Sequence, residues 1–501
     1  MFAGAAFTLR DANSPIGSRI DAAETFRQLS YKHLVAALSL GLALRLLFII
    51  HFPFHAGDTK FYDELARNLL DHGVYGLFVR GQLTPVDMRM PGYPIFLSGL
   101  YAAFGRSSKA VMFFQVFIDL LTCVLTAVIA GLIAPAASKI RVSTIALWMA
   151  ALCPFTANYN AALLTEVLST FLTTAAVLAF LMALSRSSTI SPTTLSERRA
   201  LYSQAASWLL VGVIVGLGTL VRPETPLFLL SAGMVLAVYW RQRANWTKLL
   251  LAVSWMSVGL ILPLLPWAAR NAKTLGRIEF LAPRYAQTYG DFIPRGFYSW
   301  TGTWMVRFRD AYLVTWKLGK EPIRVEDLPE AAFDSNAERA RVKLLLAQYN
   351  SNLQMSPLID REFAGLAEER KTRRPIRAYA EIPLERIGAI WFTPRIALLP
   401  YSGRLWPPKE MWRNERTGFT TTIGFGILNF VYVALATIGA WRFRKQPIVA
   451  FLIALVLIRT VFLTQLQTVE PRYVIVCYPV ILVLGALAWS QPARRLSALS
   501  N

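Results

Sequence analysis

The sequence predicts an all-α polytopic membrane protein, and three observations lead to this fold class. Of its 501 residues, 55% are apolar and 16% are charged, with a mean hydropathy of +0.42. Soluble proteins carry about 25% charged residues. The apolar residues gather in blocks of roughly 18 to 25, the length that crosses about 30 Å of hydrocarbon. Basic residues are concentrated in alternate short connections between these blocks, as in multi-pass proteins.

About ten membrane spans are predicted, within a range of roughly ten to thirteen. They cover residues 34–52, 110–134, 143–157, 164–184, 207–221, 226–240, 249–268, 419–441, 447–465 and 473–489. The chain is thereby divided into a polar cytoplasmic tail without a signal peptide (1–33), a membrane module (34–268), a large outside loop (269–417) and C-terminal membrane helices (418–501). The membrane module contains a first outside loop, 53–108. No internal repeat is evident.

The basic residues predict the orientation of these spans. With the N-terminus inside, the short inside segments hold 17 Lys and Arg residues, whereas the short outside turns hold two, Arg222 and Arg472. Both termini are therefore expected in the cytoplasm, with both long loops outside. The net charge of +22 reflects this bias, so no nucleic-acid partner is expected. Cys123, Cys153 and Cys477 lie in apolar stretches and support neither a disulfide framework nor a zinc cluster.

The first outside loop carries the strongest signal for chemistry. Asp58 follows the end of the first span, and residues 59–72 have the apolar stripe of a surface helix that Thr59 can cap. The breaker-rich segment 89–94 then leads into a second apolar helix at 95–104. A carboxylate held among amphipathic helices at the membrane surface suits a general base. The alternative is that Asp58 only caps a helix.

Ordered motifs give the chain a resemblance to a known family. The first loop contains Gly57-Asp58, Tyr62, Ala66, Asn68, Arg89-x-Pro91-Gly92-Tyr93-Pro94 and Phe104-Gly105. Downstream come Thr165-Glu166, Arg222-Pro223-Glu224, Pro266-Trp267-x-x-Arg270-Asn271 and Glu470-Pro471-Arg472-Tyr473 with Pro479. In this order and on the outside face, they resemble the GT-C membrane glycosyltransferases. The closest branch is the glycosyltransferase family 39-like group of lipid A aminoarabinose transferases and protein O-mannosyltransferases.

The resemblance implies an inverting glycosyltransferase of the bacterial inner membrane, with its active site facing the periplasm. Residues 34–268 would form the GT-C catalytic module. The donor would be a polyprenyl-phosphate-linked sugar, and the acceptor an envelope lipid such as lipid A, a glycan or a protein. Asp58 matches the catalytic acidic position that would deprotonate the acceptor, and Glu166 matches the second acidic position. No cofactor is implied.

Cationic side chains suit the phosphate of such a donor, because arginine forks match phosphate geometry. The donor phosphate is therefore assigned to Arg270 and Arg472, with Arg89 and Arg222 as further candidates; the remaining motif residues that would contact substrate are Tyr62, Tyr93, Glu224, Asn271 and Tyr473. Structural alternatives stay open. Arg222 and Glu224 can pair across a turn, Arg270-Asn271 can anchor beside Trp267, and Glu166 can complement a helix dipole.

Other polar residues have simpler interpretations. Arg45, Asp119 and Arg459 lie inside apolar spans, where Asp119 is expected to pair with one of the two arginines; the alternative is a charged path for substrate. His51 and His55 have metal-ligand spacing, but Pro53 lies between them and no further ligand completes a set. A divalent metal ion is left open but not predicted.

The large outside loop has two halves. Residues 283–316 are rich in aromatic side chains, which stack on sugars or anchor at the headgroup level. Residues 325–374 are charged and helical in pattern, as in a solvated cap, and 383–400 suit interfacial or re-entrant structure. In the resembled family, the corresponding loop covers the active site.

Two other function classes compete with a transferase. An envelope-glycan polymerase or ligase would also use a lipid-linked donor, but it would lack the early Asp58 loop. A lipid or glycan transporter would need its essential charges at mid-membrane, whereas the motifs here lie at the outside surface.

Overall fold

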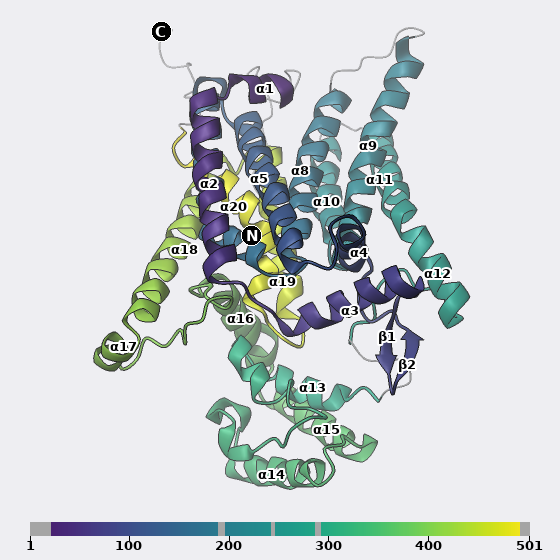
Figure 1. Ribbon diagram of the computed structural model, residues 1–501, viewed down its shortest axis with the longest axis vertical. Coiled ribbons are helices and arrows are strands. Elements are labelled where there is room, and N and C mark those ends of the chain that lie inside the picture. Colours follow the sequence, from purple (N-terminus) through teal and green to yellow (C-terminus); the bar gives the residue numbers. More distant parts are fainter. Residues whose placement is uncertain (1–21, 189–195, 242–245, 286–291, 491–501) are drawn as a thin grey trace. The chain divides into compact units, whose positions relative to one another are not determined.

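The computed structural model describes residues 22–188, 196–241, 246–285 and 292–490 (Figure 1). The chain forms two compact units, each described here by itself. Unit 1 comprises residues 1–284, 394–458 and 475–501, and unit 2 comprises 285–393 and 459–474. Residues 1–21 of the predicted tail lie outside the described residues. The predicted large loop, 269–417, is thus divided, since its two ends are part of unit 1.

Unit 1 is built almost entirely of helices. These are α1 (Ala22–Gln28), α2 (Tyr31–His51), α3 (Gly57–His72), α4 (Gly92–Phe104), α5 (Ser108–Ile133), α6 (Lys139–Ala151), α7 (Pro154–Ala157), α8 (Glu166–Ser188), α9 (Ser196–Val221), α10 (Leu227–Arg241), α11 (Trp246–Ile261), α12 (Leu265–Leu275), α17 (Pro408–Asn414), α18 (Arg416–Phe443) and α20 (Tyr478–Leu487). Its two strands, β1 (Gly76–Val79) and β2 (Gln82–Pro85), form an antiparallel hairpin. Helix α19 (Pro447–Thr464) begins in unit 1 and ends in unit 2.

The predicted spans coincide with helices. Seven helices of the described chain are long and apolar enough to cross a membrane, and the bent pair 136–161 makes an eighth. The predicted spans at 226–240 and 473–489 correspond to two shorter apolar helices, Leu227–Val238 and Pro471–Leu487. The chain is an all-α polytopic membrane protein, as the composition predicts. The count of full-length spans is lower than ten because three of the ten apolar segments are short or broken.

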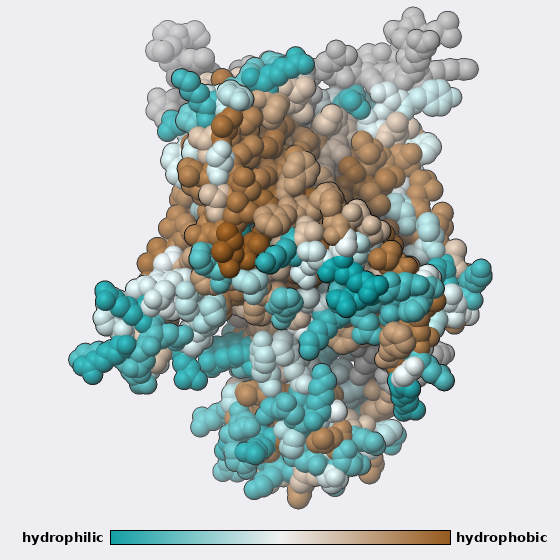
Figure 2. Space-filling view, viewed as in Figure 1, coloured by the Kyte–Doolittle hydropathy of each residue, from teal (hydrophilic) through white to brown (hydrophobic). Residues whose placement is uncertain are grey.

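Apolar side chains cover the outward faces of the long helices of unit 1, where Figure 2 shows brown atoms over α2 and α5. Exposed examples include Leu47 and Ile50 on α2 and Phe113 and Phe117 on α5. A soluble monomer rarely exposes so continuous an apolar surface. These faces are therefore the ones that lipid covers.

Glycines bring several membrane helices into backbone contact. A Cβ atom on Gly212 of α9 would lie 2.1 Å from the Met256 carbonyl oxygen of α11, and one on Gly439 of α18 would lie 1.8 Å from the Leu484 carbonyl oxygen of α20. Only glycine allows these approaches. Small residues at helix contacts are typical of membrane proteins, because close van der Waals packing replaces the hydrophobic effect within lipid.

The buried charges of the first spans form the expected ion pair. Arg45 Nε donates to Asp119 Oδ2 at 2.8 Å, and the Arg45 side chain is fully buried. Arg45 Nη1 donates to the Gly41 and Ala151 carbonyl oxygens, and Nη2 donates to Cys123 Sγ. Asn160 Nδ2 donates to Asp119 Oδ2 at 2.9 Å. This network joins α2, α5, α6 and the 3-10 segment Asn158–Ala161, so it stabilises the bundle.

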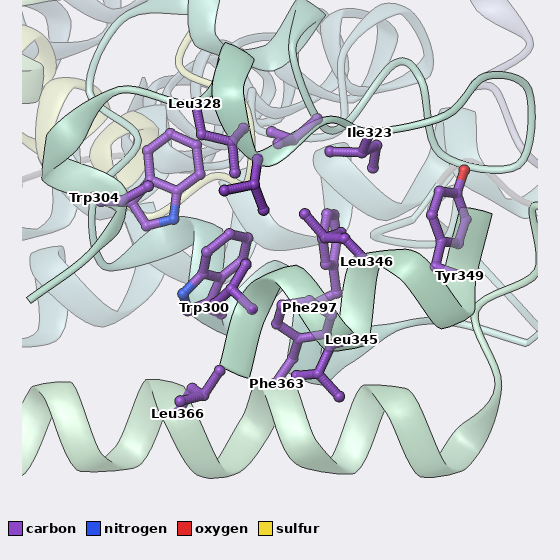
Figure 3. Close-up of a cluster of buried hydrophobic side chains, with 14 of the residues drawn as sticks. Phe297, Trp300, Trp304, Ile323, Leu328, Leu345, Leu346, Tyr349, Phe363 and Leu366 are labelled. Atoms are coloured by element: carbon purple, nitrogen blue, oxygen red, sulfur yellow. The ribbon is translucent and has the colours of Figure 1, made fainter. Parts of the chain in front are cut away.

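Unit 2 has its own hydrophobic core. Its helices are α13 (Arg295–Gly302), α14 (Asn336–Asn350), α15 (Pro357–Arg373) and α16 (Ile382–Trp391), with a π-helical turn at Arg377–Glu381. Figure 3 shows the side chains of Phe297, Trp300, Leu346 and Phe363 converging between these elements. The predicted helical cap at 325–374 is thus helical, but one face of α14 and α15 packs into this core.

The core changes the interpretation of the aromatic segment 283–316. Phe297, Trp300 and Trp304 are at most 2% exposed, so their rings fill unit 2 and are not available to sugar or headgroups. Tyr312 and Trp316 are exposed and pack against each other with ring centroids 4.1 Å apart. The two alternatives weighed from the sequence therefore apply only to the exposed rings.

Candidate functional site

Helix α3 places Asp58 in its first turn, directly after the chain leaves α2. Arg89 Nη2 donates to Asp58 Oδ1 at 3.0 Å, and both side chains are about one-fifth exposed. The expected cap by Thr59 is wrong: the helix begins at Gly57, and Thr59 Oγ1 instead donates to the Leu163 carbonyl oxygen. Asp58 is thus a partly exposed carboxylate beside a guanidinium, near the start of a helix.

The Arg-x-Pro-Gly-Tyr-Pro segment acts as a close-packed turn. A Cβ on Gly92 would lie 2.7 Å from the backbone of Leu220, so glycine lets the start of α4 touch the end of α9. The Tyr75 hydroxyl donates to the Arg89 carbonyl oxygen at 3.0 Å. Burial raises the pKa of Tyr75 well above its usual value, so it remains a neutral donor. The backbone that carries Arg89 is therefore held from both sides.

The second acidic residue forms a buried ion pair. Glu166 begins α8 and is 1% exposed, and Arg222 follows the end of α9. Arg222 Nη2 donates to Glu166 Oε1 at 2.7 Å, Nε donates to Thr165 Oγ1 at 3.0 Å, and Nη1 lies 3.4 Å from Glu224 Oε1. The pairing expected across the turn is present, but the shorter contact is the one to Glu166.

The two acidic regions lie next to each other. Phe54 forms a parallel bridge with Ala162, and Thr59 bonds to Leu163, so the start of the first loop lies against the segment that leads into Glu166. The rings of Tyr62 and Tyr93 meet edge to face, with centroids 5.2 Å apart. Burial raises the pKa of Tyr93, and the nearby Glu166 carboxylate raises it further.

Two residues that join these segments were missed by the sequence analysis. Gln115 of α5 accepts from the Tyr93 hydroxyl at 2.8 Å and donates to the carbonyl oxygens of Asn160 and Ala162. Asn160 also reaches Asp119, as described above. A signal was available for Gln115, because a glutamine within an apolar span needs internal partners; Asn160 lies between two predicted spans and gave none. Gln115 therefore connects α4 of the first loop to the segment before Glu166.

We expect Gln115→Leu to lower the free energy of unfolding by roughly 2–3 kcal/mol, because three buried polar groups lose a partner at about 1 kcal/mol each. Thermal unfolding in detergent measures this change. Tyr93→Phe removes only one of the three bonds and should cost about 1 kcal/mol. If both variants unfold at the same temperature as the wild type, the hydrogen bonds of Gln115 do not contribute to the free energy of unfolding.

Arg270 holds the base of a β-hairpin in the first loop, and the sequence analysis did not predict this hairpin. Its Nη1 donates to the Val86 carbonyl oxygen at 2.8 Å, and its Nη2 donates to the Tyr75 carbonyl oxygen. The guanidinium also lies over the rings of Tyr75 and Trp267, at 5.4 and 5.1 Å. Asn271 donates to the Glu279 carbonyl oxygen. The anchoring interpretation thus describes most contacts of Arg270.

Arg472 and Tyr473 belong to unit 2. Arg472 forms an ion pair with the Glu470 carboxylate, and the Tyr473 hydroxyl donates to Glu470 Oε1 at 3.1 Å; the Glu470 side chain is buried. Arg386 of α16 supports this segment, since it donates to the carbonyl oxygens of Thr464, Met305 and Gly302. Burial lowers the pKa of Arg386 to about 10. Arg459 Nε donates to the Tyr473 carbonyl oxygen at 3.2 Å.

Within the described ranges, no group of three or more His, Cys, Asp or Glu side chains is placed to hold a metal ion. His51 and His55 lie on either side of the end of α2, and no third ligand of these types among the described residues accompanies them.

The predicted site residues thus fall into three places. Asp58, Tyr62, Arg89, Tyr93, Glu166, Arg222 and Glu224 lie in one region of unit 1; Arg270 and Asn271 lie against the hairpin of the first loop; Arg472 and Tyr473 lie in unit 2. In Figure 1 the helices α3 and α12 and the hairpin lie at the same end of the membrane helices of unit 1. Fold and site define an all-helical polytopic membrane protein with paired acidic and basic side chains at one end of its spans.

Among solved structures, the chain is similar to archaeal oligosaccharyltransferases, which are membrane glycosyltransferases of the GT-C fold. One is AglB from Archaeoglobus fulgidus in complex with an inhibitory peptide and a dolichol-phosphate. The two sequences are 14% identical, the TM-score is 0.47, and the alignment covers 91% of this chain and 50% of that chain. Another is the Archaeoglobus fulgidus oligosaccharyltransferase with Zn and sulfate. Here the identity is 15%, the TM-score is 0.44, and the alignment covers 90% of this chain and 48% of that chain. A third is the same enzyme tethered to an acceptor peptide containing the NVT sequon. Here the identity is 16%, the TM-score is 0.46, and the alignment covers 91% of this chain and 49% of that chain.

The chain therefore spans about half the length of the solved structures that it matches. With identities of 14–16% and TM-scores below 0.5, this likeness assigns no activity and no residue role to the chain. No protein-family profile matches the chain. No curated protein matches it either.

Proposed function

We propose that the protein is an inverting GT-C glycosyltransferase that moves a sugar from a polyprenyl-phosphate carrier to an envelope acceptor on the outer side of the membrane. The observation that carries the proposal is Asp58, a partly exposed carboxylate at a helix start, next to the buried Glu166–Arg222 pair. This arrangement lies at the end of the membrane spans, where the phosphate of a lipid-linked donor would lie. The acceptor offers a hydroxyl or phosphate oxygen on lipid A, another glycan or a protein.

In the proposed reaction Asp58 acts as the general base. It takes the proton of the acceptor hydroxyl as the acceptor oxygen attacks the anomeric carbon from the face opposite the phosphate. The bond between the anomeric carbon and the phosphate oxygen breaks, and its electron pair leaves with polyprenyl phosphate. The anomeric configuration is therefore inverted, and Asp58 later releases its proton to water.

The leaving phosphate gains negative charge, which cations can neutralise. Arg89 and Arg222 are suited to this role because both already lie at the acidic residues. Arg270 and Arg472 would also bind the donor phosphate; in this structure Arg270 donates to carbonyl oxygens and Arg472 pairs with Glu470. Glu166 would orient the donor or acceptor through Arg222, and Tyr62, Tyr93, Glu224, Asn271 and Tyr473 would contact substrate.

The test uses purified protein in lipid nanodiscs with a panel of polyprenyl-phosphate sugars. Mass spectrometry follows the release of polyprenyl phosphate, with and without crude envelope fractions as acceptors. We expect release from one donor class only, which also names the sugar as a hexose, a pentose or a derivative of either. Adding a chelator to the same reactions tests for dependence on a divalent metal ion.

Each competing class predicts a different result. A polymerase or ligase would transfer preassembled glycans and leave the single-sugar donors intact. A transporter would move lipid-linked sugars between leaflets without releasing polyprenyl phosphate. If folded protein releases no carrier from any single-sugar donor, the proposed transferase activity is wrong.

A further inference from the structure

A compact loop precedes the long helix α18. Residues 402–416 contain the basic residues Arg404, Lys409, Arg413 and Arg416, and the acidic residues Glu410 and Glu415. Trp406 is 80% exposed, the highest fraction among the large apolar side chains of the described chain, and Leu405 and Trp412 are also exposed. All four basic side chains are exposed as well. The loop therefore presents both cations and apolar rings to its surroundings.

The shape of the loop is fixed by one carboxylate. Ser402 donates to Glu415 through both its backbone nitrogen, at 3.0 Å, and its hydroxyl. These bonds lower the pKa of Glu415. The short helix α17 forms the second half of the loop, and its Met411 side chain is buried. Since the loop holds four basic and two acidic side chains, its net charge is positive.

The length of α18 places this loop at a definite depth. The helix has 28 residues, which span about 42 Å at 1.5 Å per residue. A bilayer with its headgroup regions is about 40–45 Å thick. At the far end Arg444 lies over the ring of Trp441, at 3.9 Å, and at the near end Arg416 lies over Trp412, at 4.6 Å. Such aromatic and basic pairs mark the two membrane surfaces, so residues 412–416 lie among headgroups.

The side of α18 between these ends faces lipid. Ile427 and Phe430 are each 61% exposed, and Ile438 and Val431 are exposed too. The loop thus continues an apolar, lipid-facing surface at the depth where phosphates begin.

We propose that residues 404–416 bind the headgroup of an anionic phospholipid in the leaflet at the N-terminal end of α18. The guanidinium and ammonium groups of Arg404, Lys409 and Arg413 contact the lipid phosphate, and Trp406 inserts its ring between neighbouring headgroups. Each cation near an anionic surface adds favourable electrostatic free energy, which salt weakens. A protein partner is disfavoured because the loop adjoins the hydrocarbon directly through α18.

The first test measures lipid retention. Protein reconstituted in nanodiscs of mixed phosphatidylcholine and phosphatidylglycerol is extracted gently, and native mass spectrometry counts the lipids that remain bound. We expect the wild type to retain phosphatidylglycerol preferentially. The variant Arg404→Ala/Lys409→Ala/Arg413→Ala should weaken this preference on the order of tenfold, and raising the salt concentration should weaken it in the wild type.

The matched control removes the same charge elsewhere. Lys320, Arg324 and Arg361 are exposed cations of unit 2 outside every candidate span. Lys320→Ala/Arg324→Ala/Arg361→Ala should leave the preference for phosphatidylglycerol unchanged. Equal retention by the loop variant and the wild type overturns the proposal, and so does an equal loss in the control.

The second test measures depth. Cys123, Cys153 and Cys477 are buried, so a nitroxide label on Trp406→Cys is selective. We expect this label to be more accessible to oxygen and less accessible to a water-soluble nickel chelate than a label on Tyr379→Cys, an exposed position of unit 2. Chelate accessibility equal to that of position 379, or an immobilised label only after envelope proteins are added, overturns the proposal. Neither test depends on glycosyl transfer.

Discussion

Replacing Asp58 by asparagine is expected to lower turnover by about 10²- to 10⁴-fold, because an amide cannot accept the proton of the acceptor. The apparent affinity for the donor should change little, since the cations stay in place. The Asp58–Arg89 pair is about one-fifth exposed, and pairs of this kind contribute roughly 1 kcal/mol or less. The melting temperature should therefore fall only slightly. Release of polyprenyl phosphate, with thermal unfolding in parallel, measures both quantities.

The control for this variant lies on the same helix. Asp71 is near the end of α3 and is paired with Arg106. Asp71→Asn removes the same charge, so its turnover should remain near that of the wild type. If Asp58→Asn retained full turnover in folded protein, Asp58 would not be the base, and its pairing with Arg89 would have a structural role only.

Breaking the buried pair in the first spans should have the largest effect on stability. Asp119→Asn leaves Arg45, which is fully buried, without its carboxylate. Removing one member of a buried pair costs about 3–5 kcal/mol, because the remaining charge stays desolvated. A thiol-reactive dye can follow unfolding on heating, since Cys123, Cys153 and Cys477 are all buried in the folded protein. We expect a clearly lower unfolding temperature for Asp119→Asn.

The double variant Arg45→Met/Asp119→Leu separates stability from transport. Apolar side chains of similar volume often replace a buried ion pair at little cost. The double variant should therefore recover most of the stability lost in Asp119→Asn and keep near-normal turnover. If it folded normally but lost function, these charges would act on substrate, as the transporter hypothesis requires.

Much of the fold could be predicted because a membrane-spanning helix is recognised from the mean hydropathy of about 20 consecutive residues, which no single residue decides. The predicted span 110–134 is observed at Ser108–Ile133, and 419–441 at Arg416–Phe443. Segment 226–240 was predicted as a full span, but its apolar helix is too short to qualify as one. The hairpin of the first loop depends instead on a two-residue turn, Arg80-Gly81, in which both residues have positive φ. Such a turn favours a hairpin, but arginine rarely adopts it and the signal is weak.

The site could be predicted only in part, for a related reason. The family resemblance proposed Asp58 and Glu166 as the acidic residues of the site, and in the structure their segments lie side by side through Thr59 and Leu163. Spacing could not show that Arg222 pairs with Glu166, since 56 residues separate them. Likewise, an aromatic run such as Trp300 and its neighbours has the same composition whether the rings fill a core or face a ligand. Only packing distinguishes these cases.

The hairpin that Arg270 fastens also offers a way to establish which side of the membrane the acidic residues face. Its tip, Arg80-Gly81, is exposed, whereas its base is held by the backbone bonds of Arg270 to Tyr75 and Val86. Exposed loop tips tolerate insertions well. A short epitope placed between the two tip residues would leave the clamped base intact. Antibody staining of intact spheroplasts against permeabilised ones would then report the sidedness of the first loop, and with it the compartment from which an acceptor arrives.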